Sequence, residues 1–147
     1  MHPTINRCLE CGAPLVLRAH VQRTRVGRYK VEDSSLHVPR CVHGHTELSL
    51  VELASYEQRA AVIVLSEVVD VGGAEIRFAR KSLGLTQARL AALLDVAPET
   101  ISRWETGSES MSRVSRLALL AVVRSAGALA RLEKNNLAHI AEVLRVA

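Results

Sequence analysis

The chain has 147 residues, a formal net charge of +4, 48% apolar residues and only 3% aromatic residues. This length fits one ordinary domain or two small ones, and the composition favours helices packed through aliphatic side chains over a β-sandwich. The sequence contains no apolar run of the roughly 18 residues that a transmembrane helix needs, and its first residues lack the apolar stretch of a secretion signal. We therefore expect a cytoplasmic protein without membrane contacts, whose cysteines stay reduced.

All three cysteines and five of the six histidines fall within the first 45 residues. Reduced cysteines and histidines at close spacing are more often metal ligands than disulfide partners. A C-x-x-C pair is followed, further along the chain, by Cys-Val-His-Gly-His. The pattern predicts one structural Zn²⁺ ion per chain, with the ligands Cys8, Cys11, Cys41 and His45. His43 remains an alternative fourth ligand, because Gly44 stands where a second C-x-x-C would place a cysteine.

Residues 15–41, between the two ligand pairs, alternate apolar and polar side chains in short stretches. This alternation predicts short antiparallel strands, with Gly27 and the Asp33-Ser34-Ser35 sequence as turn signals. A hairpin would bring the two ligand pairs together. Since so short a segment has few large apolar groups, it needs an additional stabilising link, such as a bound metal ion, to fold. We therefore expect a β-rich zinc module over residues 1–54. Three partly buried thiols without metal remain the alternative.

The spacing of the apolar residues changes at Ser55, from alternation to a helical repeat. Ser55 followed three residues later by Gln58 has the form of a capping box and predicts a helix that runs to about Val69. A linking helix would then occupy residues 55–71, and Gly72-Gly73 marks the boundary of a helical domain over residues 72–147. The predicted fold class is α+β, with a small β-rich module followed by an all-α five-helix domain.

Three short helices are predicted at the start of this helical domain. The first covers residues 76–83 and ends at Gly84, and the second begins after Thr86, a favourable N-cap residue. A tight turn over residues 95–97 leads to a third helix, which has Pro98 in its first turn and ends at Gly107. Two short helices joined by such a turn form a helix-turn-helix. A helical bundle with an ordinary solvated surface is the alternative.

In a helix-turn-helix the second helix enters the major groove of DNA and presents its N-terminal residues to base edges. Arg103 can bond guanine O6 and N7, whereas Glu99 can accept a hydrogen bond from cytosine N4. Arg113 is placed for a phosphate contact. The residues expected to contact operator DNA are Gln87, Glu99, Thr100, Ser102, Arg103 and Arg113.

The stretch LGLTQ and the stretch TISRWETG, within residues 74–123, resemble the Cro/cI-type (XRE) helix-turn-helix family. The resemblance implies DNA binding and an ion pair between Arg80 and Glu105, while Asp95 stands at a turn position that usually holds Gly. We call the predicted helix-turn-helix segment, residues 74–123, the reader. A zinc module followed by this reader is similar to the MqsA-type antitoxins and their YgiT-type zinc-finger relatives, which carry four cysteines. That resemblance implies a zinc half that binds a ribonuclease toxin and a C-terminal half that dimerises and represses an operon.

Two further helices are expected after Gly107, over residues 111–123 and beyond Ser125-Ala126-Gly127. The last helix either packs in the core or forms the interface of a homodimer. We favour the homodimer interface, because dimers read two half-sites on DNA. Its apolar residues are Leu129, Leu132, Leu137, Ile140, Val143 and Leu144. The leading functional hypothesis is a type II antitoxin that represses its own operon and binds a small toxin. The alternative is a stand-alone regulator with a structural or metal-sensing zinc site, and we do not expect an enzyme.

Overall fold

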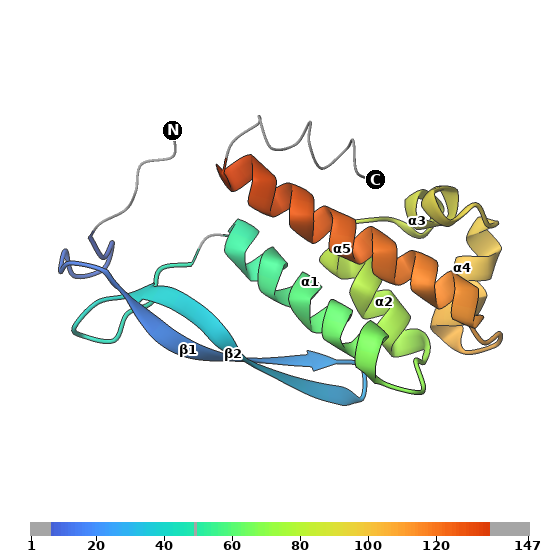
Figure 1. Cartoon of the computed structure of the whole chain (residues 1–147), viewed down its shortest axis with the longest axis horizontal. Coiled ribbons are helices and arrows are strands. Elements are labelled where there is room, and N and C mark those ends of the chain that lie inside the picture. The colour runs from blue at the N-terminus through green and yellow to red at the C-terminus, as the bar shows by residue number, and fades with distance from the viewer. Residues whose placement is uncertain (1–6, 49, 136–147) are drawn as a thin grey trace.

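The computed structural model describes residues 7–48 and 50–135, and it has a two-stranded antiparallel sheet followed by five helices (Figure 1). The predicted α+β class is confirmed. None of the described helices is long and apolar enough to cross a membrane. The elements are β1 (Val16–Val26), β2 (Tyr29–Arg40), α1 (Leu50–Glu67), α2 (Gly73–Ser82), α3 (Gln87–Leu94), α4 (Pro98–Thr106) and α5 (Arg113–Asn135).

Strands β1 and β2 form one long hairpin instead of several short strands. The predicted turn at Gly27 is confirmed, since Gly27 has a φ of +57° between the two strands. The turn predicted at Asp33–Ser35 is wrong, because β2 continues through it and the register shifts instead, opposite the step from His20 to Gln22. Asp33 Oδ1 accepts hydrogen bonds from the backbone N–H and the hydroxyl of Ser35 at 3.0 and 2.6 Å. A local bulge therefore uses these turn-forming residues without ending the strand.

Helix α1 lies between the hairpin and α5 (Figure 1). On the hairpin side, Val26 and Val31 form a buried cluster with Ala60 and Val64 of α1. On the other side, α1 joins the main core, whose buried members are Ala61, Leu65, Ile76, Ala79, Leu90, Ala91, Ile101, Trp104, Leu119, Leu120 and Val123. Because α1 contributes to both clusters, it connects the hairpin to the helices that follow.

The predicted start of the linking helix at Ser55 is wrong, because α1 begins at Leu50 and Ser55 lies inside it. Its C-terminal end is held by Arg116 of α5. The Arg116 guanidinium donates to the carbonyl oxygen of Leu65 at 2.9 Å, to that of Val69 at 3.1 Å and to that of Val68. A cation is favourable where helix carbonyls lack partners, so this contact ties α5 to the end of α1.

Helix α5 is continuous from Arg113 to Asn135, and the break predicted at Ser125-Ala126-Gly127 is wrong. One glycine inside a helix costs only about 1 kcal/mol relative to alanine, which neighbouring turns can offset. Ser112 caps the start, since its Oγ accepts from the backbone N–H of Ser115 at 3.1 Å. The rest of the predicted last helix, residues 136–147, lies outside the described residues.

The tip of the hairpin is bonded to the start of α2 through Glu75, which is buried. Glu75 Oε1 accepts from the Arg28 N–H at 2.9 Å, and Oε2 accepts from the Gly72 N–H at 2.7 Å. A Cβ on Gly27 would lie 2.1 Å from Glu75 Oε1, and a Cβ on Gly73 would lie 2.2 Å from the Glu105 carbonyl oxygen. The two glycines therefore permit close packing, of the hairpin tip on Glu75 and of α2 on the end of α4.

Candidate DNA-reading surface and metal centre

Helices α3 and α4 form the helix-turn-helix, and their local signals act as the sequence predicts. Thr86 caps α3, since its Oγ1 accepts from the Arg89 N–H at 3.2 Å. Asp95 follows α3 in the left-handed region at a φ of 53°, a conformation that Asp tolerates better than most residues. Pro98 opens α4, and Gly107 ends it at a φ of 79°.

A network of charged and polar side chains between α4 and the helices α2 and α3 fixes the position of α4. Arg80 Nε lies 2.6 Å from Glu105 Oε1, and Arg80 Nη2 donates to Glu105 Oε2 at 3.0 Å. Gln87 Nε2 donates to Glu105 Oε2 at 2.9 Å, and Arg77 Nε lies 3.5 Å from the same oxygen. The side chain of Glu105 is 1% exposed and that of Arg80 is 12% exposed. The ion pair implied by the family resemblance is thus present, and it is almost fully removed from water.

The pKa of Glu105 reflects two opposed causes. Burial raises the pKa of this carboxyl, but hydrogen bonds from Arg80 and Gln87, with the positive charges of Arg80 and Arg77, outweigh it. The pKa of Glu105 consequently lies below its ordinary value of 4.5. Glu105 is therefore ionised at neutral pH, and it joins α4 to side chains of α2 and α3.

Helix α4 buries Ile101 and Trp104 and presents a polar face on its other side. On this face Glu99 and Arg103 are exposed, whereas Thr100 and Ser102 are half-buried. Arg103 Nη1 lies 3.4 Å from Glu109 Oε2, in the loop that follows α4. Most of the residues predicted to contact DNA are thus accessible along one helix.

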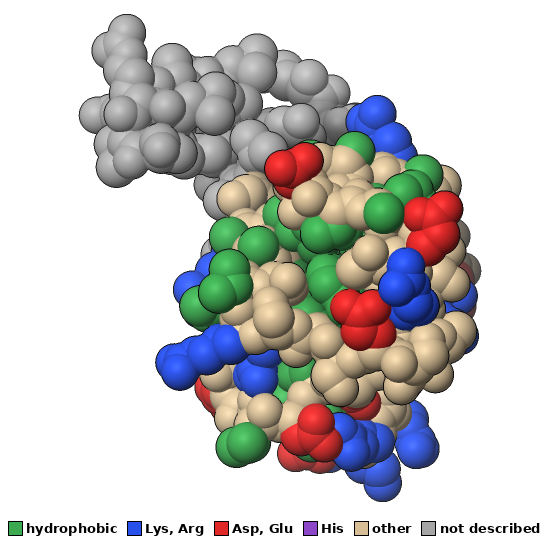
Figure 2. Space-filling model, turned by 90° about the vertical axis from the view of Figure 1, so that its right-hand side faces the viewer, with side chains coloured by type: hydrophobic (Ala, Val, Ile, Leu, Met, Phe, Trp, Pro, Cys, Tyr) green, Lys and Arg blue, Asp and Glu red, His purple; other side chains and the backbone are tan. Residues whose placement is uncertain are grey.

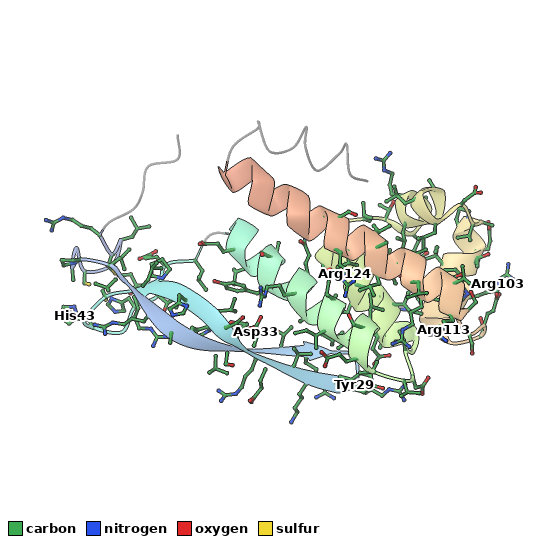
Figure 3. All side chains as sticks on the ribbon, in the orientation of Figure 1. Tyr29, Asp33, His43, Arg103, Arg113 and Arg124 are labelled. Carbon is green, nitrogen blue, oxygen red and sulfur yellow. The ribbon has the colours of Figure 1, made fainter. Side chains whose placement is uncertain are left out.

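Two predicted contact residues lie outside α4. Arg113, the exposed first residue of α5, lies at the same end of the molecule as Arg103 (Figure 3). Gln87 is half-buried, and its side chain is engaged with Glu105. The contact of Gln87 with operator DNA remains a prediction. Figure 2 shows this end of the molecule face-on, with Lys and Arg side chains around the margin and acidic side chains between them.

The residues predicted as metal ligands come together at one end of the hairpin. One ligand atom from each of four side chains lies within 4.8 Å of the other three. The sulfurs of Cys11 and Cys41 are 3.7 Å apart, and Cys8 Sγ lies 3.5 Å from His45 Nδ1. A tetrahedral zinc ion with Zn–S bonds of about 2.3 Å has S···S edges of about 3.8 Å and S···N edges of about 3.6 Å. The set Cys8, Cys11, Cys41 and His45 therefore fits one tetrahedral ion.

Two short loops position these ligands. In the first loop the Gly12 N–H donates to the Cys8 carbonyl at 2.8 Å, and in the second the Gly44 N–H donates to the Cys41 carbonyl at 3.0 Å. Both glycines have positive φ values, of 70° and 89°, which favour glycine. The second loop closes one residue earlier than the first. The next side chain after Gly44, that of His45, then takes the fourth position.

Carboxylates that the sequence reasoning missed surround these loops. His45 Nε2 lies 3.4 Å from Glu10 Oε2, so the nitrogen turned away from the sulfurs has an acidic partner. Such outer partners orient metal-binding imidazoles. Glu47 Oε1 accepts from the Leu9 N–H at 2.9 Å and bridges the two loops. His43, the alternative ligand, is exposed and places its Nδ1 3.4 Å from Cys11 Sγ.

The pKa values of two thiols in this cluster, those of Cys41 and Cys8, are shifted in opposite directions. Burial raises the pKa of Cys41, but hydrogen bonds from the backbone N–H groups of His43 and His45, and from the neighbouring thiols, outweigh it and lower the value to about 6. Burial raises the pKa of Cys8 to about 11, against opposing backbone hydrogen bonds. The lowered pKa of Cys41 favours its thiolate, the form in which cysteine binds metals.

Comparison with known protein families finds a match for the segment that contains α3 and α4. Residues 76–123 match the family model described as helix-turn-helix. No curated protein matches the chain. The match begins within α2 and ends within α5, so it contains the Arg80–Glu105 pair and the whole of α4. Residues 76–123 are therefore similar to a helix-turn-helix, a type of domain that binds DNA in transcription regulators.

Proposed function

We propose that the chain is a transcriptional repressor that reads operator DNA through the polar face of α4. The supporting observation is that Glu99 and Arg103 on this face are exposed, while the buried Arg80–Glu105 pair holds α4 itself in place against α2. A reading helix needs a fixed orientation, because hydrogen bonds to base edges tolerate only small displacements. Arg103 would then recognise a guanine, and Arg113 would contact a phosphate.

Arg103→Ala and Arg113→Ala are expected to weaken DNA binding in different ways. The first should reduce affinity by about 1–3 kcal/mol and relax the preference at one base pair, because a base contact is lost. The second should weaken all sequences alike and reduce the salt slope by about one unit. Binding to DNA selected from a random-sequence pool, measured at several salt concentrations, distinguishes the two.

Arg18→Ala is the matched control, because this exposed arginine lies on β1, away from α4. It should leave affinity and salt dependence unchanged. If the Arg103 and Arg113 variants both bind like the unmodified protein, the proposed reading surface is wrong.

We also infer that the four-residue cluster at the end of the hairpin binds Zn²⁺. Three thiolates and one imidazole are a donor set typical of structural zinc, and the interatomic distances match a tetrahedral ion. Four protein ligands leave no position for a substrate. The ion would stabilise the two loops, whose few apolar side chains cannot do so alone.

The metal end of the hairpin supports a second role, that of an antitoxin which captures a protein partner. Each metal-binding loop exposes an aliphatic side chain, Leu9 at 74% and Val42 at 78%, and Leu17 on β1 is 65% exposed. Exposed apolar groups that cluster mark interaction sites. This end lies opposite Arg103 along the molecule, as the position of His43 shows (Figure 3). A small ribonuclease toxin bound there would leave α4 free for DNA.

The capture role has a direct test with paired variants. The tagged protein, purified from its native host, should carry a small stoichiometric partner that is absent from a Leu9→Glu/Val42→Glu variant with full metal content. Arg103→Ala serves as the control and should retain the partner. If no such partner accompanies the unmodified protein, the antitoxin role fails and the stand-alone regulator with a structural or metal-sensing zinc site is supported.

Operator reading also favours a homodimer. A single recognition helix reads few base pairs, and helix-turn-helix proteins reach useful affinity by placing two of them on successive half-sites. These half-sites are about 34–36 Å apart, or one turn of DNA. We propose that two copies of this chain bind one operator in this way.

A further inference from the structure

A cavity of about 410 Å³ lies between α1 and α5, which pack side by side (Figure 1). Its walls include the aliphatic side chains of Val62 and Ile63 on α1 and Val123 on α5. Val123 also belongs to the main core, so this wall is held in place by the packing behind it. Cavities of this volume are in the range that holds small organic molecules. The cavity is separate from the polar face of α4 and from the four-residue metal cluster.

One polar atom at the cavity is a hydrogen-bond acceptor without a donor. Gln58 of α1 lines the cavity, and its Nε2 donates to the Ser82 carbonyl at 3.1 Å. The other atom of this amide, Gln58 Oε1, is buried and has no hydrogen-bond partner among the described residues. A buried acceptor without a partner is unfavourable, and native structures contain few of them. Gln58 Oε1 therefore marks a position where an N–H or O–H group of a ligand would bind.

Two arginines give the cavity a positive charge. Arg124 of α5 is exposed and forms no ion pair with a described residue. Arg59 of α1 donates through Nε to Asp33 Oδ2 and through Nη2 to Ser35 Oγ, both at 2.7 Å. Figure 3 labels Arg124 on α5 and Asp33 on β2, with α1 between them. None of the seven described residues that line the cavity is acidic. The charge of the cavity is therefore complementary to an anion, and a carboxylate can accept two parallel hydrogen bonds from a guanidinium.

We propose that this cavity binds a small organic acid with a carboxylate, an apolar body and one hydrogen-bond donor. The carboxylate binds Arg124, and the donor binds Gln58 Oε1. The apolar body lies against Val62, Ile63 and Val123. Such a ligand contacts α1 and α5 at the same time, and it lies beside the arginine that is bonded to the bulge of β2. This binding site goes beyond the proposed DNA reading and does not depend on it.

Indole-3-acetate, indole-3-propionate and indole-3-butyrate are suitable probes, because each combines a carboxylate, an apolar ring and one N–H at a different separation. Calorimetry with the full chain as purified should show at least one of them binding at one site per chain, with a Kd below about 1 mM. The best acid should bind about tenfold more tightly than its primary amide, which lacks the charge. It should also bind more tightly than its N-methyl analogue, which lacks the donor.

Two variants assign the polar contacts of the best acid. Arg124→Gln should weaken binding of the acid about tenfold and leave binding of the amide unchanged, because only the carboxylate loses a partner. Gln58→Leu should remove the preference for the N–H probe over its N-methyl analogue. Arg89→Gln is the matched control, since this arginine is exposed on α3 and does not line the cavity. Unchanged thermal unfolding without probe shows that each variant keeps its fold.

The proposal is overturned if none of the three acids binds, because water alone would then occupy the cavity and bond the Gln58 amide. Binding that Arg124→Gln leaves unchanged, or that does not distinguish the acid from its amide, would also refute it. If Gln58→Leu does not fold, the N-methyl analogue still tests the donor contact on the unmodified chain. The DNA-binding measurements on the Arg103 and Arg113 variants are independent of each of these outcomes.

Discussion

Replacing Glu105 by alanine is expected to lower the free energy of unfolding by about 3–5 kcal/mol. The change would leave the Arg80 guanidinium, 12% exposed, without the carboxylate that accepts two of its hydrogen bonds. Removing one member of a buried ion pair is costly because the other charge remains unpaired and away from water. Urea unfolding at pH 7 measures the loss. Glu99→Ala, at an exposed position of the same helix, should stay within about 0.5 kcal/mol of the unmodified chain.

The same residue predicts a pH dependence. Because the pKa of Glu105 is below its unfolded value of 4.5, its ionised form stabilises the fold above that value. This stabilisation is lost as the pH falls through the lower folded-state pKa. Glu105→Gln removes the titration, so its stability deficit should be largest near neutral pH and should shrink below about pH 4.5. A deficit that does not change between pH 7 and pH 3 would contradict the ionised pair.

Cys8→Ser is expected to abolish stoichiometric zinc binding and to unfold the hairpin end of the chain. The purified chain should carry one zinc ion, measured by elemental analysis together with the protein concentration. Metal binding and folding are coupled in small zinc modules, so loss of the Cys8 sulfur should also remove the dispersed amide signals of the two ligand loops, residues 8–12 and 41–45, from the NMR spectrum. Zinc-free protein with a folded hairpin end would refute the metal site.

His45→Ala and His43→Ala identify the fourth ligand. The His45 variant should lose zinc, since Nδ1 of this residue lies 3.5 Å from Cys8 Sγ within the four-residue cluster. The His43 variant should keep zinc, because this exposed histidine is outside that cluster. The reverse pattern would assign the ion to His43. The two variants control for each other, as both remove an imidazole from the same loop.

The sequence was sufficient to predict the helices of the reader because their boundaries depend on neighbouring residues. Thr86 caps α3 with its own hydroxyl, and Gly107 ends α4 through its own backbone conformation. That Cys8, Cys11, Cys41 and His45 lie close together was equally predictable, since two short Cys/His clusters joined by an alternating segment come together in a hairpin. The Arg80–Glu105 pair came from the resemblance to a family, because spacing alone does not pair residues on separate helices.

The predictions that proved wrong relied on local signals that do not by themselves begin or end a helix or a strand. Ser55 has the form of an N-cap, yet α1 starts at Leu50. Gly127 lies inside α5, and Asp33 bonds Ser35 within a continuing strand. The buried role of Glu75 was missed altogether, although a Glu three residues after Gly72 is a recognisable helix-start signal. Its second partner, the Arg28 N–H, is 47 residues away in the chain, and no local pattern indicates such a contact.

The bond between the hairpin tip and α2 limits how this reader could be exchanged between proteins. A segment beginning at Gly72 would contain the matched family residues, but it would lack the Arg28 N–H that Glu75 accepts. It would also uncover Phe78, which packs against the cluster formed by Val26 and Val31. Fused to a different N-terminal domain, this segment would expose the Phe78 side chain to water, and Glu75 would keep only one of its two backbone N–H partners. Hairpin and reader are therefore expected to be inherited as a pair, with substitutions at the tip matched by substitutions in α2.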